Sequence, residues 1–364
     1  MTMGRLLPAL LLAAPAAWAQ EAAPPADAQT VAIVAAADAF LATLDEDQRA
    51  AVEFPFGPPG TASAAEFPGA RITFVGERFG ESVWSNYPVS DVPRPGLRLG
   101  EMTEDARAAA MALLGAVLSP EGFDKVQGIM EADQLLSESG TPYDDGIDVY
   151  TMGIFGTPSP TDPWMLQFGG HHLGLNAVVA GPDVSIAPTL TGVQPATFLR
   201  DGQEVRPLGD ENDKAFALMA ALDPAQHDVA VLDYDVGDLV LGPGHDGQAL
   251  QPEGLAGADM TADQRALLLD LVAEWVRMLN EDDAAPKLAR IEADLDETFF
   301  AWSGPTEPGS AVYFRVTGPT VHIEFAHQGS PPNGTGVQAP GVNHVHTVYR
   351  DPTDEYGAAS TGES

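Results

Sequence analysis

The stretch SAVYFRVTGPTVHIEFAH, residues 310–327, predicts the class of fold to which this chain belongs. Apolar and polar residues alternate on both sides of Thr317-Gly318-Pro319, which is the pattern of two half-buried strands joined by a short turn. Two such strands pair as an antiparallel hairpin. After a loop that begins QGSPPNGTG, the segment NHVHTVY (343–349) alternates in the same way. The C-terminal part of the chain therefore predicts an antiparallel sheet.

Capped helices are predicted at three places by one repeated pattern. Leu44, Leu222 and Met260 are each followed by an Asp or Thr and then, three positions further on, by a Gln. This spacing is typical of a capping box, in which the Gln side chain accepts from the N–H of the cap residue. A weaker copy without the Gln begins at Met102. The uneven spacing of the copies excludes a solenoid, and both an old duplication and the repeated use of a good helix start explain them.

The remaining patterns complete the predicted architecture. Periodicity and capping predict helices at 30–44, 103–118, 212–222 and 261–280, and apolar runs bounded by Gly or Pro predict strands at 71–76, 149–156 and 164–181. Helices and antiparallel hairpins in one chain indicate the α+β class rather than a Rossmann-like order. We therefore predict a mixed, largely antiparallel sheet with C-terminal hairpin strands, flanked by several capped helices.

The first nineteen residues have the pattern of a signal peptide. Arg5 precedes an apolar stretch that ends at Ala17-Trp18-Ala19, so the mature chain is predicted to begin at Gln20, in the periplasm or outside the cell. That stretch is too short for a good membrane span, and none of the later ones is long enough. The predicted organisation is a signal peptide at 1–19, a disordered tether at 20–29, a single α+β domain at 30–357 and a disordered tail at 358–364.

The composition excludes several classes of partner and ligand. The chain has 53 Asp and Glu residues against 17 Lys and Arg, a formal net charge of −36, which argues against nucleic acid and anionic lipid as partners. Either attraction of cations or a solvated acidic shell suited to a saline habitat explains this charge. Cysteine is absent, so any bound metal must use His, Asp, Glu, backbone groups or water.

The histidines near the C-terminus are candidate metal ligands. Alternate side chains of a strand share one face, so His344 and His346 project the same way and both imidazoles can meet one ion. In the strand before them, His322 and Glu324 share a face opposite the apolar residues. If the two strands pair, a carboxylate and up to three imidazoles could converge.

A second histidine element lies in the segment GGHHLGLN (169–176). On a strand His171 and His172 would point to opposite faces, and His172 shares its side with the polar Asn176, so His172 is favoured as the ligand unless the preceding glycines form a bulge. Such a ligand set suits one transition metal ion, Zn, Cu, Fe or Mn, and does not distinguish among them. The alternative is that these histidines are ordinary polar groups that bond across strands.

Five further residues are candidates for the site: Arg350 and Asp351 for catalysis, and Asn176, Tyr356 and Trp164 for contacts with a substrate. Arg350 either clamps a carboxylate or phosphate group or pairs with a neighbouring acid, and Asp351 followed by Pro either acts at the site or begins a turn. Tyr356 either donates a hydrogen bond to the site or packs, and Trp164 lies in the core or lines a cleft. An acidic run of calcium-loop-like spacing lacks the Glu of an EF-hand and predicts an acidic turn: Asp233, Asp235 and Asp238.

Three segments resemble the bacterial family catalogued as domain of unknown function 3500: GGHHLGLN (169–176), FAWSG (300–304) and NHVHTVYRDPTDEYG (343–357). The resemblance covers residues 30–357 and implies export and one compact domain, without an established activity. Gly169 stands where the family often has Glu, which puts in doubt a mechanism that uses that carboxylate. The family's motifs match this chain at His171, His172, Asn176, Glu324, His344, His346, Arg350, Asp351 and Tyr356.

The sequence therefore predicts an exported metalloprotein whose ion is held by His344, His346 and one of His171 or His172. Glu324 would be a ligand or a base, and Arg350 would orient an anionic group of a small organic substrate in hydrolysis or redox chemistry. Two alternatives stay open, a protein that binds a transition metal without turnover and a metal-free enzyme in which His and Glu exchange protons. The oligomeric state is not predicted.

Overall fold

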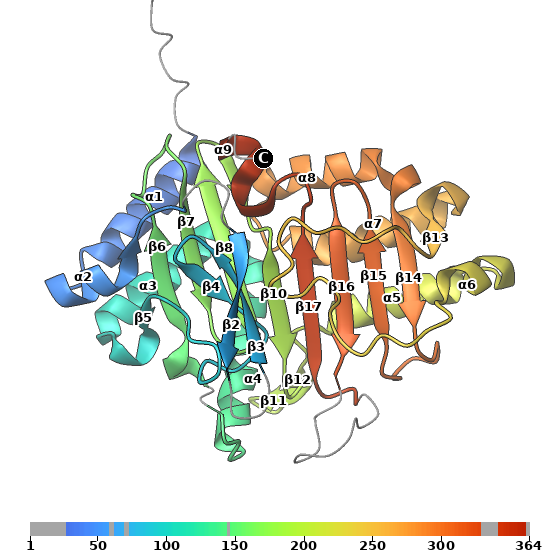
Figure 1. The fold of residues 1–364 in the computed structure, drawn as a ribbon, viewed down its shortest axis with the longest axis horizontal. Coiled ribbons are helices and arrows are strands. Elements are labelled where there is room, and N and C mark those ends of the chain that lie inside the picture. Colours follow the sequence, from blue (N-terminus) through green and yellow to red (C-terminus); the bar gives the residue numbers. More distant parts are fainter. Residues whose placement is uncertain (1–26, 58–61, 69–72, 144–145, 329–340, 362–364) are drawn as a thin grey trace, which may run out of the picture.

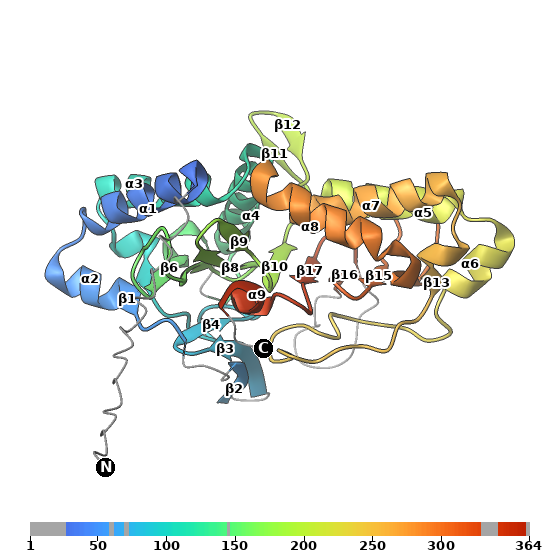
Figure 2. The same ribbon diagram turned by 90° about the horizontal axis from the view of Figure 1, so that it is seen from above.

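The computed structural model describes residues 27–57, 62–68, 73–143, 146–328 and 341–361. The predicted signal peptide and most of the predicted tether lie outside these residues. The elements form three layers, in which helices cover one face of a wide sheet and the other face carries a small sheet and a long irregular segment (Figures 1 and 2). Within the described residues, no helix combines the length and the apolar character that crossing a membrane requires.

The helices begin where the capping patterns predict. The side chains of Asp45, Asp223 and Thr261 each form a complete capping box with the Gln three positions on. The helices are α1 (Ala28–Leu41), α2 (Glu46–Val52), α3 (Glu104–Val117), α4 (Pro120–Glu138), α5 (Gly209–Ala221), α6 (Pro224–Ala230), α7 (Ala262–Val276), α8 (Glu281–Ala293) and α9 (Ala358–Thr361).

The wide sheet has 12 strands, in the order β1-β6-β7-β8-β10-β17-β16-β15-β14-β13, with β5 against β6 and β9 against β8. Only the β1–β6 pair among these is parallel, which confirms the predicted α+β fold with a mixed, largely antiparallel sheet. The strands are β1 (Glu53–Phe54), β5 (Leu97–Arg98), β6 (Thr151–Phe155), β7 (Trp164–Gly169), β8 (Leu173–Ala180), β9 (Asp183–Ser185), β10 (Thr189–Val193), β13 (Leu255–Ala256), β14 (Phe299–Ser303), β15 (Tyr313–Thr317), β16 (His322–His327) and β17 (Val345–Arg350).

Smaller elements lie outside this sheet. A three-stranded sheet of β2 (Ala62–Pro68), β3 (Thr73–Phe79) and β4 (Ser82–Trp84) lies on the face opposite the long helices, and β11 (Phe198–Arg200) pairs with β12 (Gln203–Val205). Short 3₁₀ turns are η1 (Leu99–Glu101), η2 (Ile147–Val149), η3 (Gly257–Asp259), η4 (Leu295–Glu297) and η5 (Glu355–Gly357).

The two halves of the chain repeat one order of elements. In the N-terminal half two helices, α1 and α2, are followed by an insertion and then by β5-η1-α3-α4-η2-β6-β7-β8-β9-β10, in which the short β9 has no counterpart in the other half. In the C-terminal half α5 and α6 are followed by an irregular segment (232–254) and then by β13-η3-α7-α8-η4-β14-β15-β16-β17. The capping boxes of α2 and α6 occupy the same place in this order. Internal duplication therefore explains the repeated helix starts better than chance reuse does.

The halves join where β10 pairs with β17. Thr191 lies opposite Thr347, and their hydroxyls are 2.8 Å apart, while the indole N–H of Trp275 donates to the Thr347 hydroxyl at 2.7 Å. On the helical side, Leu118 and Leu279, which follow α3 and α7, also form a bridge. Equivalent elements of the two halves thus meet each other at both places.

Three sequence expectations differ from the structure. The helices α4 and α8 were not predicted, because α4 carries charged and Gly residues between its apolar positions and α8 contains Pro286. The segment 164–181 is not one strand but the hairpin β7–β8, since the chain bends at residues 170–172. The last four residues before 362, predicted as part of a tail, form α9.

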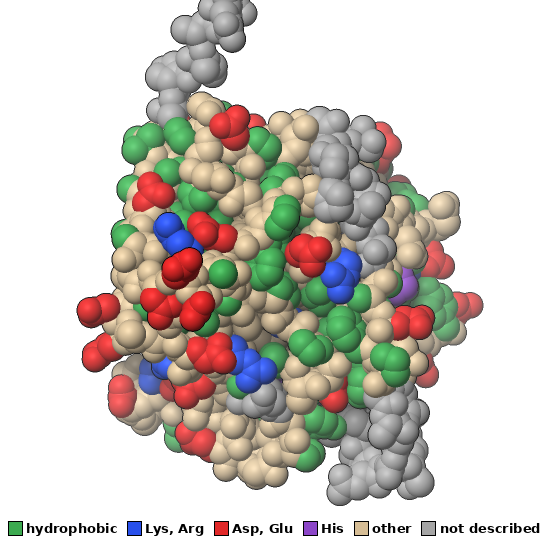
Figure 3. All heavy atoms as spheres, turned by 60° about the vertical axis from the view of Figure 1, so that its left-hand side comes forward, with side chains coloured by type: hydrophobic (Ala, Val, Ile, Leu, Met, Phe, Trp, Pro, Cys, Tyr) green, Lys and Arg blue, Asp and Glu red, His purple; other side chains and the backbone are tan. Residues whose placement is uncertain are grey.

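The acidic surface has few basic residues to offset it. On the face shown in Figure 3, Asp and Glu side chains are scattered widely, and the few Lys and Arg side chains lie close to acidic ones. Typical pairs are Lys214 with Asp270, at 2.8 Å, and Arg206 with Asp213, at 2.8 Å. On this face the basic side chains are thus paired with acidic ones, and many acidic side chains are left over.

Two helical glycines test how tightly the halves pack. A Cβ at Gly122, in the first turn of α4, would lie 2.4 Å from the carbonyl oxygen of Met278, whereas one at Gly115, in α3, would have no atom nearer than 4.0 Å. We expect Gly122→Ala to lower the free energy of unfolding by roughly 1–3 kcal/mol, because the backbone at Met278 must move away from the added methyl group. Gly115→Ala should raise it by up to about 1 kcal/mol through helix propensity. Urea denaturation of both variants measures this, and equal effects would contradict the packing.

Candidate metal centre

Three imidazole nitrogens converge at one end of the central strands. His172 lies in the bend between β7 and β8, His344 directly precedes β17, and His346 is in β17. Nε2 of His344 is 3.0 Å from Nε2 of His172 and 3.1 Å from Nε2 of His346. His172 and His346 are buried, and His344 is partly exposed.

Strand β10 lies between the strands that carry these histidines, and a glycine leaves space for the rings. Gly192 lies opposite His346 and donates its N–H to the carbonyl of His172 at 2.7 Å. A Cβ on Gly192 would be 3.0 Å from Cδ2 of His172 and 3.1 Å from Cδ2 of His346. The two rings can therefore approach each other because residue 192 has no side chain.

Asp133 determines which nitrogen of His172 faces the centre. Its carboxylate, on α4, lies 2.5 Å from Nδ1 of His172 and also accepts from the Tyr150 hydroxyl at 2.7 Å. Burial raises the pKa of Asp133, but His172, His171 and the Tyr150 hydroxyl together lower it further, so the net pKa is below its usual range. A carboxylate only accepts hydrogen bonds, so Nδ1 of His172 carries the hydrogen and Nε2 carries a lone pair.

His346 has a similar carboxylate neighbour. Its Nδ1 lies 3.3 Å from Oδ1 of Asp238, in the irregular segment, and 3.3 Å from Nδ2 of Asn86. A ring that offers its Nε2 lone pair has Nδ1–H, and of these two neighbours the carboxylate is the acceptor. Asp238 also influences Tyr87 nearby, because burial and then this carboxylate raise the pKa of the Tyr87 phenol.

The three nitrogens have too few hydrogens to bond to one another. With hydrogens on Nδ1 of His172 and His346, Nε2 of His344 can donate to one neighbour and must face a second lone pair at hydrogen-bond distance. Burial, followed by the other histidines, lowers the pKa of His172 to about 4 and that of His344 well below its usual range, so additional protons are disfavoured. Within the described residues, the buried Nδ1 of His344 has no hydrogen-bond partner.

The arrangement fits a metal ion. Four nitrogens at ordinary zinc–nitrogen distances around a tetrahedral ion are about 3.3 Å apart, close to the separations observed. His172, His344 and His346 offer ligand atoms that all lie within 4.8 Å of one another. These residues could hold a transition metal, and three imidazoles do not determine which one.

Asp133, His171 and His172 form a second group within the same distance. The rings of His171 and His172 stack with centroids 3.9 Å apart, so they do not point to opposite faces as the strand pattern predicted, because residues 170–172 form a bend. The 2.5 Å contact of Asp133 with His172 is a hydrogen bond and is too short for two ligands of one ion. His171 therefore lies beside the three-histidine group rather than in it.

Glu324 and His322 do not join the three histidines. Ala326 lies opposite His346 in the β16–β17 register. Glu324 is two residues from Ala326 along β16, which is about 7 Å along the strand. Nε2 of His322 lies 3.1 Å from Oε1 of Glu324, and the Tyr313 hydroxyl donates to Oε2 at 2.6 Å.

The Glu324 carboxylate also anchors the irregular segment. It accepts from the N–H groups of Val240 and Leu241, at 2.6 Å each. Burial raises the pKa of Glu324, but the hydrogen bond from His322 and the other donors lower it below its usual range. The sheet and the irregular segment are thus joined at this carboxylate.

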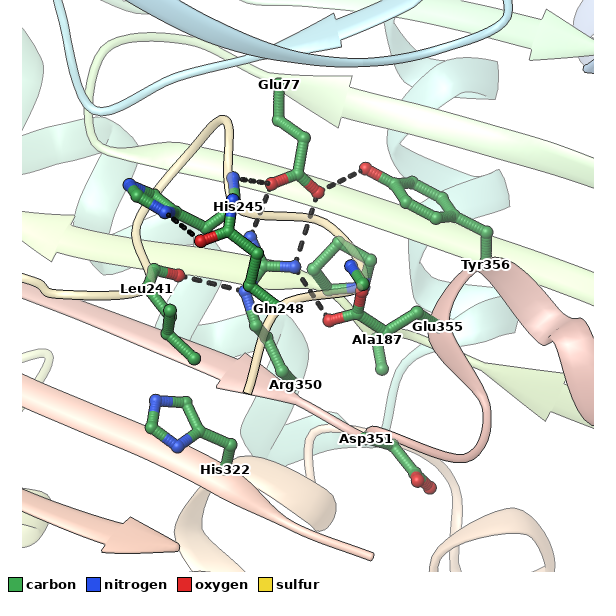
Figure 4. Close-up of polar contacts among 12 residues, drawn as sticks. Glu77, Ala187, Leu241, His245, Gln248, His322, Arg350, Asp351, Glu355 and Tyr356 are labelled. Carbon is green, nitrogen blue, oxygen red and sulfur yellow. Dashed lines mark hydrogen bonds and ion pairs between the residues drawn. The ribbon is translucent and has the colours of Figure 1, made fainter. Parts of the chain in front are cut away.

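Arg350 is buried in a network at the opposite end of β17, shown in Figure 4. Its guanidinium donates to both oxygens of Glu77, to Glu355 at 2.7 Å, and to the carbonyls of Leu241 and Gly242 at 2.9 and 3.1 Å. These five contacts use all five N–H groups of an arginine. The described geometry therefore leaves no N–H of Arg350 for a substrate.

The other candidate residues are structural in their contacts. The Tyr356 hydroxyl donates to Glu77 at 2.7 Å. Asp351 accepts from Arg290 at 3.0 Å and from the N–H of Thr353, as in the predicted turn. The remaining two are buried among strands: Asn176 donates to the carbonyl of Pro188 at 2.9 Å, and Trp164 donates to the carbonyl of Ser159 at 3.2 Å.

The sequence patterns missed the groups that support the histidines. Asp133 lies on the unpredicted helix α4, and Asn86 and Gly192 carry no local signal. Asp238 was noticed as part of an acidic run, but its contact with His346 depends on how residues 232–254 cross the sheet. The His-x-His spacing and the polar side assigned to His172 were the useful signals.

Comparison with known proteins gives one match. Residues 70–358 match the family model described as Protein of unknown function (DUF3500). No curated protein and no solved structure matches the chain.

The network around Arg350 predicts a pH dependence of stability. Burial raises the pKa of Glu355 to about 7, more than Arg350 lowers it, and Asp246 beside it adds to the rise. The folded state therefore binds more protons than the unfolded state between about pH 4.5 and 7, and stability from this group is lost as pH rises through that range. Glu355→Gln lacks this loss, so from pH 5 to 8 the variant should gain roughly 1–3 kcal/mol relative to the wild type.

Chemical denaturation at several pH values measures the difference. Glu307→Gln, at an exposed glutamate, removes the same charge and should show no comparable trend. A constant difference between wild type and Glu355→Gln across this range would contradict the prediction.

Proposed function

The chain belongs to the DUF3500 family, and from the geometry of its three imidazoles we propose that it is a metalloprotein that binds one transition metal ion through His172, His344 and His346. The observation that carries this proposal is the convergence of three Nε2 atoms at 3.0 and 3.1 Å without enough hydrogens to bond to one another. The Asp133 carboxylate supports it, because a carboxylate behind a ligating imidazole is the usual arrangement in metal sites.

We propose further that the ion acts on a small organic molecule. Three protein ligands leave a coordination position for a substrate or water, as in catalytic rather than structural zinc sites. The ion would supply Lewis-acid or redox chemistry there. The chain's own groups would orient the ligands, since Asp133 and Asp238 each hold one imidazole by Nδ1, and the partly exposed His344 lies toward solvent.

Two other functions have less support. A protein that holds the ion without turnover gains some support from two cavities, of about 370 and 180 Å³, because both are lined by residues other than these histidines. A metal-free acid–base pair of His322 and Glu324 would need a free carboxylate oxygen, and both oxygens of Glu324 accept from other groups.

Export is part of the proposal and rests on sequence. The Arg5-led apolar stretch that ends at Ala17-Trp18-Ala19 is typical of a cleaved signal. The centre would then take up its ion in the periplasm or outside the cell. N-terminal sequencing of the protein from its native host would show whether the mature chain begins at Gln20.

Removal of one ligand tests the metal centre directly. Protein purified without a nickel column and then dialysed should retain about one equivalent of a first-row metal, and His346→Ala should retain less than about a tenth. The melting temperature of His346→Ala in metal-replete buffer should fall, because metal binding stabilises the folded state. Elemental mass spectrometry and thermal denaturation measure both.

A matched control is His227→Ala, which removes an imidazole on α6. It should keep the metal content and the metal-dependent stabilisation of the wild type. A wild-type protein that retains under about a tenth of an equivalent in every first-row metal tested would remove the metal proposal.

Gly192 tests the space between the rings. Gly192→Ala places a methyl group 2.9 Å from the carbonyl oxygen of Val345 and 3.0 and 3.1 Å from Cδ2 of His172 and His346, so both rings and the start of β17 must shift. We expect metal affinity to fall by roughly 10–100-fold, the range seen when groups that orient ligands are disturbed. Gly237→Ala, where nothing lies within 4 Å, is the control. Competition with a metal chelator measures both affinities, and equal values for both variants would contradict the predicted crowding.

A further inference from the structure

The charges around the three histidines differ on the two sides of the group. Two carboxylates contact the imidazoles, Asp133 at Nδ1 of His172 and Asp238 at Nδ1 of His346. Asp133 is fully buried, whereas about a third of the Asp238 side chain is exposed. The negative charge of Asp238 therefore lies on the solvent side of the centre.

Asp133 has a compensating cation. The buried Arg94 is close enough for mutual electrostatic influence, and burial lowers its pKa to about 9, so it is still charged near neutral pH. Its guanidinium donates to the carbonyls of Ser85, Tyr87 and Gly170, at 2.8, 2.6 and 3.0 Å, and to that of Val92. Arg94 thus joins the segment that carries Asn86 to the bend that carries His172, with its charge in the interior.

Asp238 has no such partner among the described residues. Its ion-pair neighbour is His346, and its other oxygen lies 3.5 Å from the amide nitrogen of Asn86. Two other buried arginines on this side of the sheet have their own acidic partners: Arg350 is bound by Glu77 and Glu355 (Figure 4), and Arg315 is bound by Glu253. No Lys or Arg in the described parts of the chain lies within ion-pair distance of Asp238.

The position of Asp238 is determined by nearby backbone contacts. Two and three residues further on, the N–H groups of Val240 and Leu241 donate to Glu324, and that of Gly244 donates to Glu77 at 3.1 Å. The irregular segment is thereby attached to strands of both sheets. Asp238 is therefore held beside His346 and is not a mobile surface carboxylate.

We propose that Asp238 determines the charge selectivity of the metal centre, which admits neutral or cationic ligands and disfavours anions. The inference rests on the proposed metal site and names its class of ligand. The Asp238 carboxylate lies beside a metal ligand and has no Lys or Arg partner among the described residues, so it repels an anion that approaches the ion, and low dielectric near the buried rings strengthens this repulsion. The same carboxylate can accept a hydrogen bond from an amine, amide or hydroxyl group of a ligand.

Small ligands of the cobalt-loaded full-length mature protein test the proposal. Azide is the anionic probe and imidazole the neutral one, and the visible spectrum of Co²⁺ reports the binding of each. Asp238→Asn keeps an oxygen that accepts from His346 but removes the charge. We expect azide to bind Asp238→Asn about fivefold or more tightly than it binds wild type at low salt, with imidazole affinity within about twofold. The azide effect should shrink as ionic strength rises.

Two further variants complete the test. Asp235→Asn removes the same charge from an exposed position in the same segment and should leave both affinities unchanged. Asn86→Asp adds a charge on the other side of Nδ1 of His346 and should weaken azide binding, which tests the proposal even if Asp238→Asn loses cobalt. Unchanged azide affinity in both Asp238→Asn and Asn86→Asp, or equal changes for azide and imidazole, would overturn the proposal.

The outcomes separate this inference from the metal proposal itself. If wild-type protein binds no stoichiometric Co²⁺, the metal site fails. Suppose that the wild type binds Co²⁺ and His346→Ala does not. If azide affinity is then the same in Asp238→Asn as in wild type, only the charge selectivity fails.

Discussion

The pairing of β10 with β17 is the constraint on which the rest of this structure depends. It is the seam between two halves with the same order of elements, and Thr191 and Thr347 meet at its centre. Without this pairing, the β7–β8 bend of one half and the first residues of β17 in the other would not lie at the same end of one sheet. The candidate metal centre is therefore a property of the joined halves, with His172 from one and His344 and His346 from the other.

The two corresponding ends of the repeated scaffold differ in their polar groups. In the repeated order, the β15–β16 turn corresponds to the β7–β8 bend, and β10 corresponds to β17. The corresponding end of the sheet therefore lies near His322 and Arg350, which are opposite each other in the β16–β17 register. There His322 contacts Glu324, and Arg350 donates to Glu77 and Glu355. One end presents unsatisfied imidazole nitrogens, and the other is satisfied internally.

The two insertions give the histidine end its surroundings. The small sheet β2–β3–β4 leads into the segment with Asn86, and the irregular segment 232–254 supplies Asp238. They lie on the same face of the wide sheet (Figure 2), and Glu77 of β3 joins them by accepting from the N–H groups of Gly244 and His245. Because the insertions differ between the halves, the histidine end of the repeated scaffold has its own charged neighbour, Asp238, and a solvent exposure that the other end lacks.

The sequence by itself determined the local features. Alternation determined the C-terminal strands, Asp-to-Gln and Thr-to-Gln spacing determined three helix starts, and the His-x-His spacing placed two imidazoles together, because each depends on residues within one or two turns or on one strand face. Only the tertiary structure decided that His172 completes the group, that Asp133 and Asp238 support it, and that Arg350 is bound internally. These contacts join residues far apart in the chain, and they follow from strand order, from the bend at 170–172 and from the paths of the insertions, which no local pattern records.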